Sequence, residues 1–195
     1  RAPDVHCLPV GNAGNITAHW IGYSELAGMG TTACLHCQGS CPFGKHTQQH
    51  RRPRMVGYQA SGAAPFLRGH FVEHPDTVAT AIRIGAPQSW EQARSAQTES
   101  GGWFDELSDA EILATQRWLA GHEGIFCEPA SAISLAGALR DLRAVRIPPR
   151  ALVVCTLTGH CLKDTSVVMG EGAAEIVEVD VARAAVRAAL SNHLY

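Results

Sequence analysis

The sequence lacks the features that mark several large classes of protein. No apolar run reaches the ~18 residues that a membrane-spanning helix needs, and no secretory signal opens the chain. A net charge of -2 argues against nucleic acid as the main partner. With 46% hydrophobic and 17% charged residues, the 195-residue chain has the composition of a soluble globular domain with a sizeable core.

The cysteines do not form an even set of the kind that a disulfide framework needs. There are seven, and three of them crowd between Cys34 and Cys41. Cys7, Cys127 and Cys155 instead lie in apolar, strand-like runs, where buried reduced thiols are common. The pattern predicts a reducing, cytoplasmic compartment.

Strand-like and helix-like segments alternate along the chain. Strands are predicted for residues 5–10, 54–60, 125–127 and 151–157, and helices for residues 16–27, 75–84, 88–96, 108–121, 129–142 and 180–190. Ser108 and Glu111 form a capping-box pattern, and Pro129 suits the first turn of a helix. This alternation predicts an α/β fold: a three-layer α/β/α domain with a mostly parallel sheet.

A glycine-rich turn, Gly11-Asn12-Ala13-Gly14-Asn15, follows the first predicted strand and precedes a predicted helix. Backbone N–H groups that converge at a helix N-terminus bind phosphate, and Asn12 and Asn15 add side-chain donors. The turn is neither a Walker loop nor GxGxxG. Taken alone, it is equally well interpreted as a tight turn that binds nothing.

Six ordered segments carry a family resemblance: PVGNAGNITAHW, GYQASGAAP, TVATAIRIGAPQSW, ESGG, IFCEPASAISLAG and VVCTLTGHCLKD. Together they resemble the threonine synthase family, whose members are fold-type-II pyridoxal phosphate (PLP) enzymes. The resemblance covers residues 5–24 and 53–165. It implies a fold-type-II PLP domain that is incomplete in this chain.

The resemblance also implies roles for individual residues. Gly11, Asn12, Ala13, Gly14 and Asn15 would cradle the PLP phosphate, and the hydroxyl of Thr158 would lie near the pyridine nitrogen. A hydroxyl there favours a neutral nitrogen more than a carboxylate would. Glu128 and Ser131 match a family segment near the cofactor, although Glu128 also reads as a surface acid beside a helix start.

The implied reaction converts O-phospho-L-homoserine and water to L-threonine and phosphate, in an enzyme that is a homodimer when intact. Alternative hypotheses are a non-catalytic, truncated remnant, or another fold-type-II lyase such as threonine dehydratase or cysteate synthase. The segment TVATAIRIGAPQSW points away from the dehydratase.

The lysine that forms the Schiff base with PLP (below, the catalytic lysine) has no match in this chain. In the family it lies upstream of the phosphate loop in a Ser-Phe-Lys-Asp-like segment. The chain has only Lys45 and Lys163, and neither context fits. The chain also begins at Arg1 rather than Met. We therefore expect residues 1–195 to be the C-terminal part of the large domain, without the smaller domain, and to be inactive alone.

Two departures from the family pattern remain. Cys161 stands where the family has glycine, and it would strain the loop if that position needs positive φ. Residues 29–52 form an atypical insertion, in which Cys34, Cys37, Cys41 and His46 have a spacing that could bind zinc. The simpler interpretations are an exposed loop without metal or a translation artefact, and a zinc-dependent interaction domain is the weakest hypothesis.

Overall fold

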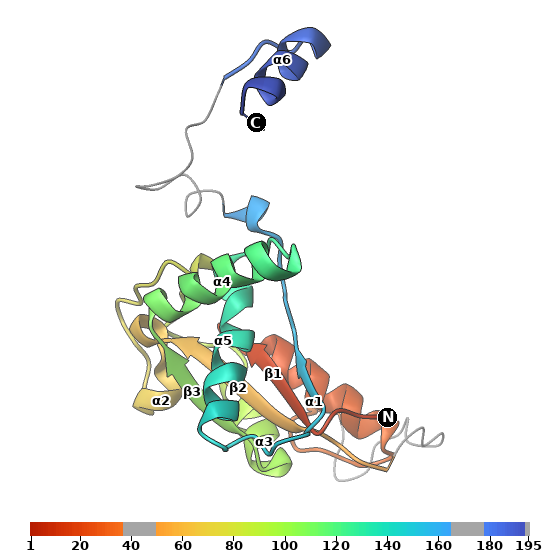
Figure 1. Cartoon of the computed structure of the whole chain (residues 1–195). Helices are drawn as coiled ribbons and strands as arrows, with labels where there is room; N and C mark the ends of the chain where they lie inside the picture. The colour runs from red at the N-terminus through yellow and green to blue at the C-terminus, as the bar shows by residue number, and fades with distance from the viewer. Residues whose placement is uncertain (37–49, 165–177, 194–195) are drawn as a thin grey trace. The chain divides into compact units, whose positions relative to one another are not determined.

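The computed structural model describes residues 1–36, 50–164 and 178–193. The chain divides into two compact units, Arg1–Asp164 and Thr165–Tyr195. The second unit contributes the helix α6 (Arg183–His193), close to the predicted 180–190. The first unit contains the sheet (Figure 1).

A four-stranded parallel sheet forms the centre of the first unit. Its strands are β1 (Val5–Pro9), β2 (Arg54–Ala60), β3 (Trp103–Leu107) and β4 (Val153–Cys155), in the order β3-β2-β1-β4. All five residues of β1 are buried, as expected for a parallel strand covered on both faces. This confirms the predicted parallel sheet.

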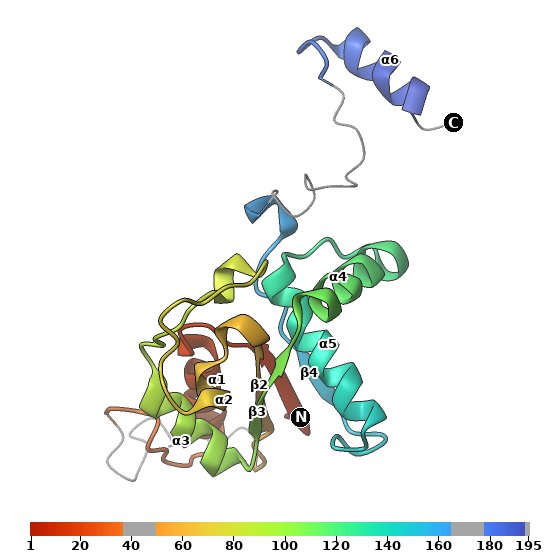
Figure 2. The same cartoon turned by 90° about the vertical axis from the view of Figure 1, so that its left-hand side faces the viewer.

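Helices cover both faces of this sheet. On one face lie α1 (Gly14–Leu26), α2 (Pro65–Arg68) and α3 (Trp90–Ser100); α5 (Pro129–Arg143) packs on the other, with α4 (Asp109–Glu123) against it (Figure 2). The predicted three-layer α/β/α architecture is therefore confirmed.

Alternation along the strands divides the core into two clusters. Leu8 and Met55 point toward α1 and α3, where they pack with Trp20. Cys7 and Val56 point to the opposite face, toward α5. Because successive side chains of a strand point to opposite faces, each strand contributes to both clusters.

A buried carboxylate ties α5 to two strands. Asp141 on α5 accepts hydrogen bonds from the Tyr58 hydroxyl at 2.6 Å and from the Trp103 indole N–H at 2.9 Å. Asp141 is only 3% exposed, so both bonds satisfy a charge that burial would otherwise make costly. The position of α5 over β2 and β3 is fixed by polar contacts as well as by packing.

Most of the predicted elements are confirmed. β2 has the predicted bounds, and α1 and α3 begin within two residues of the predicted starts. The capping box at Ser108 is present, with both reciprocal bonds to Glu111. Pro129 occupies the first turn of α5.

The helix predicted for residues 75–84 is wrong. The segment is a loop with a 3-10 turn at Thr80–Ile82. The carboxylate of Asp109 accepts bonds from the Thr77 hydroxyl and from the Val78 N–H. A tertiary partner thus takes a backbone donor that a helix would have used internally.

The other errors concern strands. Residues 125–127 form no strand; Cys127 makes a single antiparallel bridge with His160. β3 was not predicted, although Trp103-Phe104 after Gly102 is a short strand-like signal. None of the described helices is long and apolar enough to cross a membrane.

The start of the atypical insertion is anchored by Glu99 on α3. Its carboxylate accepts bonds from the Trp20 indole at 2.8 Å, the Thr31 hydroxyl at 2.6 Å and the Thr32 N–H at 2.8 Å, and also from the Thr32 hydroxyl. Burial alone would raise the pKa of Glu99, but these hydrogen bonds outweigh it and lower the pKa to about 2.

We expect Glu99→Gln to lower the free energy of unfolding by about 1–3 kcal/mol at pH 7, because bonds to an ionised acceptor are lost. Since the folded pKa is depressed, this stabilisation is fully present above the unfolded pKa of 4.5 and is lost as pH falls toward 2. Urea unfolding between pH 7 and pH 3 should show the two proteins converging as the pH falls.

Glu91→Gln, at an exposed position in the first turn of the same helix, is the control and should lower the unfolding free energy by less than about 1 kcal/mol, through the helix dipole alone. A difference between wild type and Glu99→Gln that stays constant with pH would contradict the role of the ionised carboxylate.

Candidate functional site

The candidate site lies where the order of the strands reverses. From β1 the chain proceeds to β2 and β3 on one side, and β4 then pairs with β1 on the other side. In open α/β sheets, ligands bind at the carboxyl ends of the strands at such a point. A pocket of about 290 Å³ lies there, lined by Pro9, Gly11, Asn12, Ala13, Gly14, Asn15, Ala81, Ile82, Glu128, Thr158 and Lys163.

The loop after β1 is shaped by close packing and by one left-handed residue. A Cβ atom on Gly11 would lie 3.1 Å from the Ile82 Cα, so a side chain there would push the loop away from its neighbour. Ala13 has φ 62° at the N-cap of α1, which turns the chain sharply into the helix. At Gly14, by contrast, a Cβ atom would meet nothing within 4 Å. The loop therefore leaves open space beside the first turn of α1.

The asparagine side chains do not both act as the sequence suggested. The Asn15 side-chain N–H donates to the Pro9 carbonyl at 2.7 Å, and its oxygen accepts from the Ile16 N–H at 2.7 Å. Asn15 thus braces the loop rather than offering its whole amide to a ligand. Asn12 has an exposed side chain, and its carbonyl accepts from the Ser89 N–H at 3.1 Å.

The first turn of α1 offers backbone donors to the pocket. The first N–H groups of a helix have no intrahelical partner. Here the Ile16 N–H is taken by the Asn15 side chain and the Thr17 N–H by the Ala13 carbonyl. Within the described part of the chain, this leaves the N–H groups of Gly14 and Asn15 for an anion, at the positive end of the helix dipole.

Thr158 faces the same pocket from the loop after β4. It is exposed, and its hydroxyl lies 3.1 Å from the Ser131 hydroxyl and donates to Glu128 Oε1 at 3.3 Å. Ser131 also accepts from the Gly159 N–H at 2.9 Å. These bonds join the loop after β4 to the N-terminus of α5, which fixes the position of the Thr158 hydroxyl.

Glu128 is a buried acid, so its interpretation as a surface residue is wrong. It is 3% exposed, caps the N-terminus of α5 by position, and lies 3.8 Å from the Lys163 ammonium. A Cβ atom on its neighbour Gly159 would lie 2.4 Å from Glu128 Oε1, so a side chain at this position would require the carboxylate to shift. A buried carboxylate is thus built into the wall of the pocket.

Lys163 and the segment Ala81–Ile82 line the pocket but were not predicted to. The Thr80 hydroxyl donates to the Asp164 carboxylate at 2.6 Å, which connects the segment before Ala81 to the end of the TGHCLKD segment. Ala81 and Ile82 lie in the segment TVATAIRIGAPQSW, and Lys163 lies in VVCTLTGHCLKD, and this was the one signal in the sequence that could have indicated them. Because Thr80 and Asp164 are 84 residues apart, local sequence patterns could not show that the two segments meet at the pocket.

Cys161 does not strain its loop. It begins the 3-10 helix Cys161–Lys163, and the described non-glycine residues with positive φ are Ala13, Val145 and Arg150. Burial raises the pKa of the Cys161 thiol, so the side chain is neutral at pH 7. The condition for strain, a positive φ at this position, is therefore not met.

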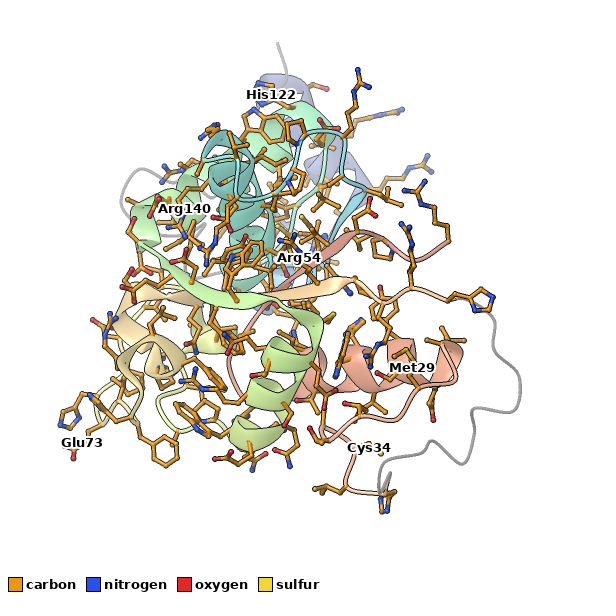
Figure 3. All side chains as sticks on the ribbon, turned by 90° about the horizontal axis from the view of Figure 1, so that it is seen from below. Met29, Cys34, Arg54, Glu73, His122 and Arg140 are labelled. Atoms are coloured by element: carbon orange, nitrogen blue, oxygen red, sulfur yellow. The ribbon has the colours of Figure 1, made fainter. Side chains whose placement is uncertain are left out.

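The zinc hypothesis falls mainly outside the described residues. Cys37, Cys41 and His46 lie in 37–49, which the structure does not describe. Cys34, labelled in Figure 3, lies after α1. Within residues 1–36, 50–164 and 178–193, no group of three or more His, Cys, Asp or Glu residues is arranged to hold a metal ion.

The contact between Gly159 and Glu128 can be tested by stability. We expect Gly159→Ala to lower the free energy of unfolding by about 1–2 kcal/mol, because its methyl group displaces a buried carboxylate. In a Glu128→Ala background the same substitution should cost much less, as urea unfolding can measure. Gly121→Ala, on α4 where a Cβ atom meets nothing within 4 Å, is the control and should raise the free energy of unfolding by up to about 1 kcal/mol in both backgrounds. An equal penalty in both backgrounds would contradict the contact.

The pocket suits a phosphorylated ligand. One wall has free N–H donors at a helix N-terminus beside a glycine whose Cβ space is open, and the opposite wall has an exposed hydroxyl and a buried acid. The first wall can hold an anionic group, and the second wall can hydrogen-bond a polar group of a ligand.

Several curated proteins are similar in sequence to most of this chain. The threonine synthases of Synechocystis sp., Mycobacterium bovis and Bacillus sp. are 48%, 50% and 42% identical to this chain over 84%, 84% and 92% of its length. The chain spans only 38%, 41% and 46% of those relatives.

Solved structures share the fold. Threonine deaminase isoform 2 from Solanum lycopersicum superposes with a TM-score of 0.61 at 16% identity, covering 85% of this chain and 40% of that one. A fungal L-serine ammonia-lyase from Rhizomucor miehei gives a TM-score of 0.57 at 18% identity, covering 81% and 45%.

The family model described as "Pyridoxal-phosphate dependent enzyme" matches residues 1–159, which include both walls of the pocket except Lys163. The description of this family names a phosphorylated cofactor. The chain therefore belongs to the pyridoxal-phosphate dependent enzyme family.

Proposed function

We propose that this chain is the cofactor-binding part of a threonine synthase, an enzyme that converts O-phospho-L-homoserine and water to L-threonine and phosphate. One observation carries the proposal. The glycine loop after β1 and Thr158 after β4 line one pocket, in a chain 42–50% identical to three threonine synthases.

The residues of the pocket have distinct proposed roles. The N–H groups at Gly14 and Asn15, with the rest of the Gly11–Asn15 loop, hold the phosphate of PLP. The Thr158 hydroxyl lies at the pyridine nitrogen, positioned by Ser131 and Glu128. When bound, PLP withdraws electrons from the bonds at Cα of an amino acid and so makes its protons removable.

The alternatives are less well supported. Threonine deaminase resembles this chain in fold, but at 16% identity the similarity gives no information about the substrate. The threonine synthases match at 42–50% identity over most of the chain. A remnant without a catalytic role differs from our proposal only in whether the catalytic lysine is supplied.

The catalytic lysine is the element that we propose to lie in another part of the enzyme. Lys45 is outside the described residues, and Lys163 lies in the pocket beside Glu128, 3.8 Å away. Without a lysine in the family context, proton transfer at the substrate loses its main acid–base group. We propose that the intact enzyme is a homodimer in the cytoplasm; the described thiols Cys7, Cys127, Cys155 and Cys161 form no disulfide, which fits a reducing compartment.

Binding of PLP tests the pocket without any turnover. We expect Gly14→Val to weaken PLP binding by about tenfold or more, because its branched side chain enters the open space beside the first-turn N–H groups. Equilibrium dialysis with detection of PLP absorbance measures the affinity. Gly121→Val, in equally open space on α4, is the matched control. Equal affinities for wild type and Gly14→Val would remove the loop from the site.

Turnover tests the function. The purified chain with PLP should release no phosphate from O-phospho-L-homoserine above background, because it lacks the catalytic lysine. A chimera in which residues 1–164 replace the matching part of the Synechocystis sp. relative should produce threonine and phosphate. Phosphate release by the chain alone would contradict the proposed inactivity. A chimera that binds PLP but makes no threonine would contradict the proposed function.

A further inference from the structure

Two side chains of opposite charge line the pocket of the candidate site on the side of Thr158. Among the described residues that line this pocket, Glu128 and Lys163 are the only titratable ones. The adjacent Asp164 carboxylate accepts from the Thr80 hydroxyl. Glu128 is 3% exposed, whereas the Lys163 side chain is 65% exposed. Solvent therefore screens the ammonium much more than the carboxylate, and the carboxylate acts more strongly on a ligand in the pocket.

The two oxygens of the Glu128 carboxylate have different neighbours. Oε1 accepts from the Thr158 hydroxyl at 3.3 Å, and Oε2 lies 3.8 Å from the Lys163 ammonium. Oε1 also packs closely against Gly159, where an added Cβ atom would lie 2.4 Å from it. The Glu128 backbone N–H donates to the Gly159 carbonyl at 3.0 Å. These contacts hold the carboxylate directly behind the Thr158 hydroxyl.

The surroundings of Glu128 favour its ionised form. Glu128 is the N-cap residue of α5, at the positive end of the helix dipole, and the Lys163 ammonium lies beside it. Burial above all, with a contribution from the Glu128 charge, raises the pKa of the Cys127 and Cys161 thiols, so both are neutral at neutral pH. His160 is exposed and is not among the lining residues of the pocket.

The direction of the Thr158 proton decides what this hydroxyl offers to a ligand. A hydroxyl has one proton to donate and two lone pairs that accept. The proton of Thr158 is directed at Glu128, and the Ser131 hydroxyl, 3.1 Å away, can donate to the same oxygen. Thr158 then presents a lone pair to the pocket and accepts from an N–H group. The carboxylate behind it favours a positive charge on that group.

We propose that Glu128 and Lys163 tune the ring nitrogen of PLP in opposite directions: Glu128, acting through Thr158, favours the protonated nitrogen, and Lys163 opposes it by competing for the same carboxylate. A carboxylate thus acts on the ring although the residue next to the nitrogen is a threonine. Both are positioning residues that adjust how strongly the ring withdraws electrons. This inference rests on the proposed function, because it requires the ring nitrogen to lie at Thr158.

Nitrogen NMR of ring-labelled PLP bound to the whole chain tests the inference, because protonation moves the nitrogen resonance far upfield. We expect Glu128→Gln to lower the pH at which the bound nitrogen is half protonated by about one pH unit or more. Lys163→Met should raise it by about half a pH unit, less because Lys163 is exposed. Glu25→Gln, which removes an acid in the last turn of α1, is the control and should leave it unchanged.

A purely structural role would not shift the two variants in opposite directions. Equal midpoints in wild type, Glu128→Gln and Lys163→Met, or shifts of the same sign in both variants, would overturn the inference and leave the proposed function intact. A nitrogen that stays neutral in wild type wherever the chain is folded would overturn it as well.

Equilibrium dialysis separates this inference from the proposed function. If the wild-type chain binds no PLP, the proposed function fails and the inference fails with it. If Glu128→Gln unfolds or loses PLP, the exposed Lys163→Met variant decides alone. A midpoint in Lys163→Met at or below that of wild type would then overturn the inference.

Discussion

The pairing of β1 on both sides is the constraint on which the rest of the first unit depends. β1 is wholly buried between β2 and β4, with Cys7 beside Val56 on one side and Cys155 on the other. Parallel pairing brings the carboxyl ends of neighbouring strands to the same edge. The glycine loop and Thr158 therefore face each other although they lie in distant parts of the sequence. If β4 did not return to β1, the pocket would have only one wall.

The pocket combines a wall of backbone with a wall of side chains. The loop after β1 offers N–H groups whose directions are set by the left-handed Ala13 and by the brace from Asn15. The opposite wall is held by the bonds that Ser131 makes to the loop at Gly159. Backbone donors suit an anion that must be held without a titratable partner, whereas the hydroxyl and the buried carboxylate of the other wall suit the polar edge of a ring.

The two edges of the sheet have different charged residues. At the carboxyl edge, the acid Glu128 is buried and paired with Lys163. At the amino edge, Arg51 and Arg54 are exposed, in a stretch between Glu25 and Glu73 that contains no acid. The fold separates these charges by the length of the strands.

The sequence by itself determined the α/β class, the elements with strong local signals and the glycine loop. The capping box at Ser108 and the proline at the start of α5 act within one helical turn, so their effect is readable from neighbouring residues. Tertiary structure alone decided the rest. Residues 75–84 are a loop in which the Val78 N–H donates to Asp109, and not the predicted helix. Glu128 is buried in the wall of the pocket, which Lys163 also lines. In each case the deciding partner lies far away in the sequence, and local patterns hold no information about which distant groups will meet.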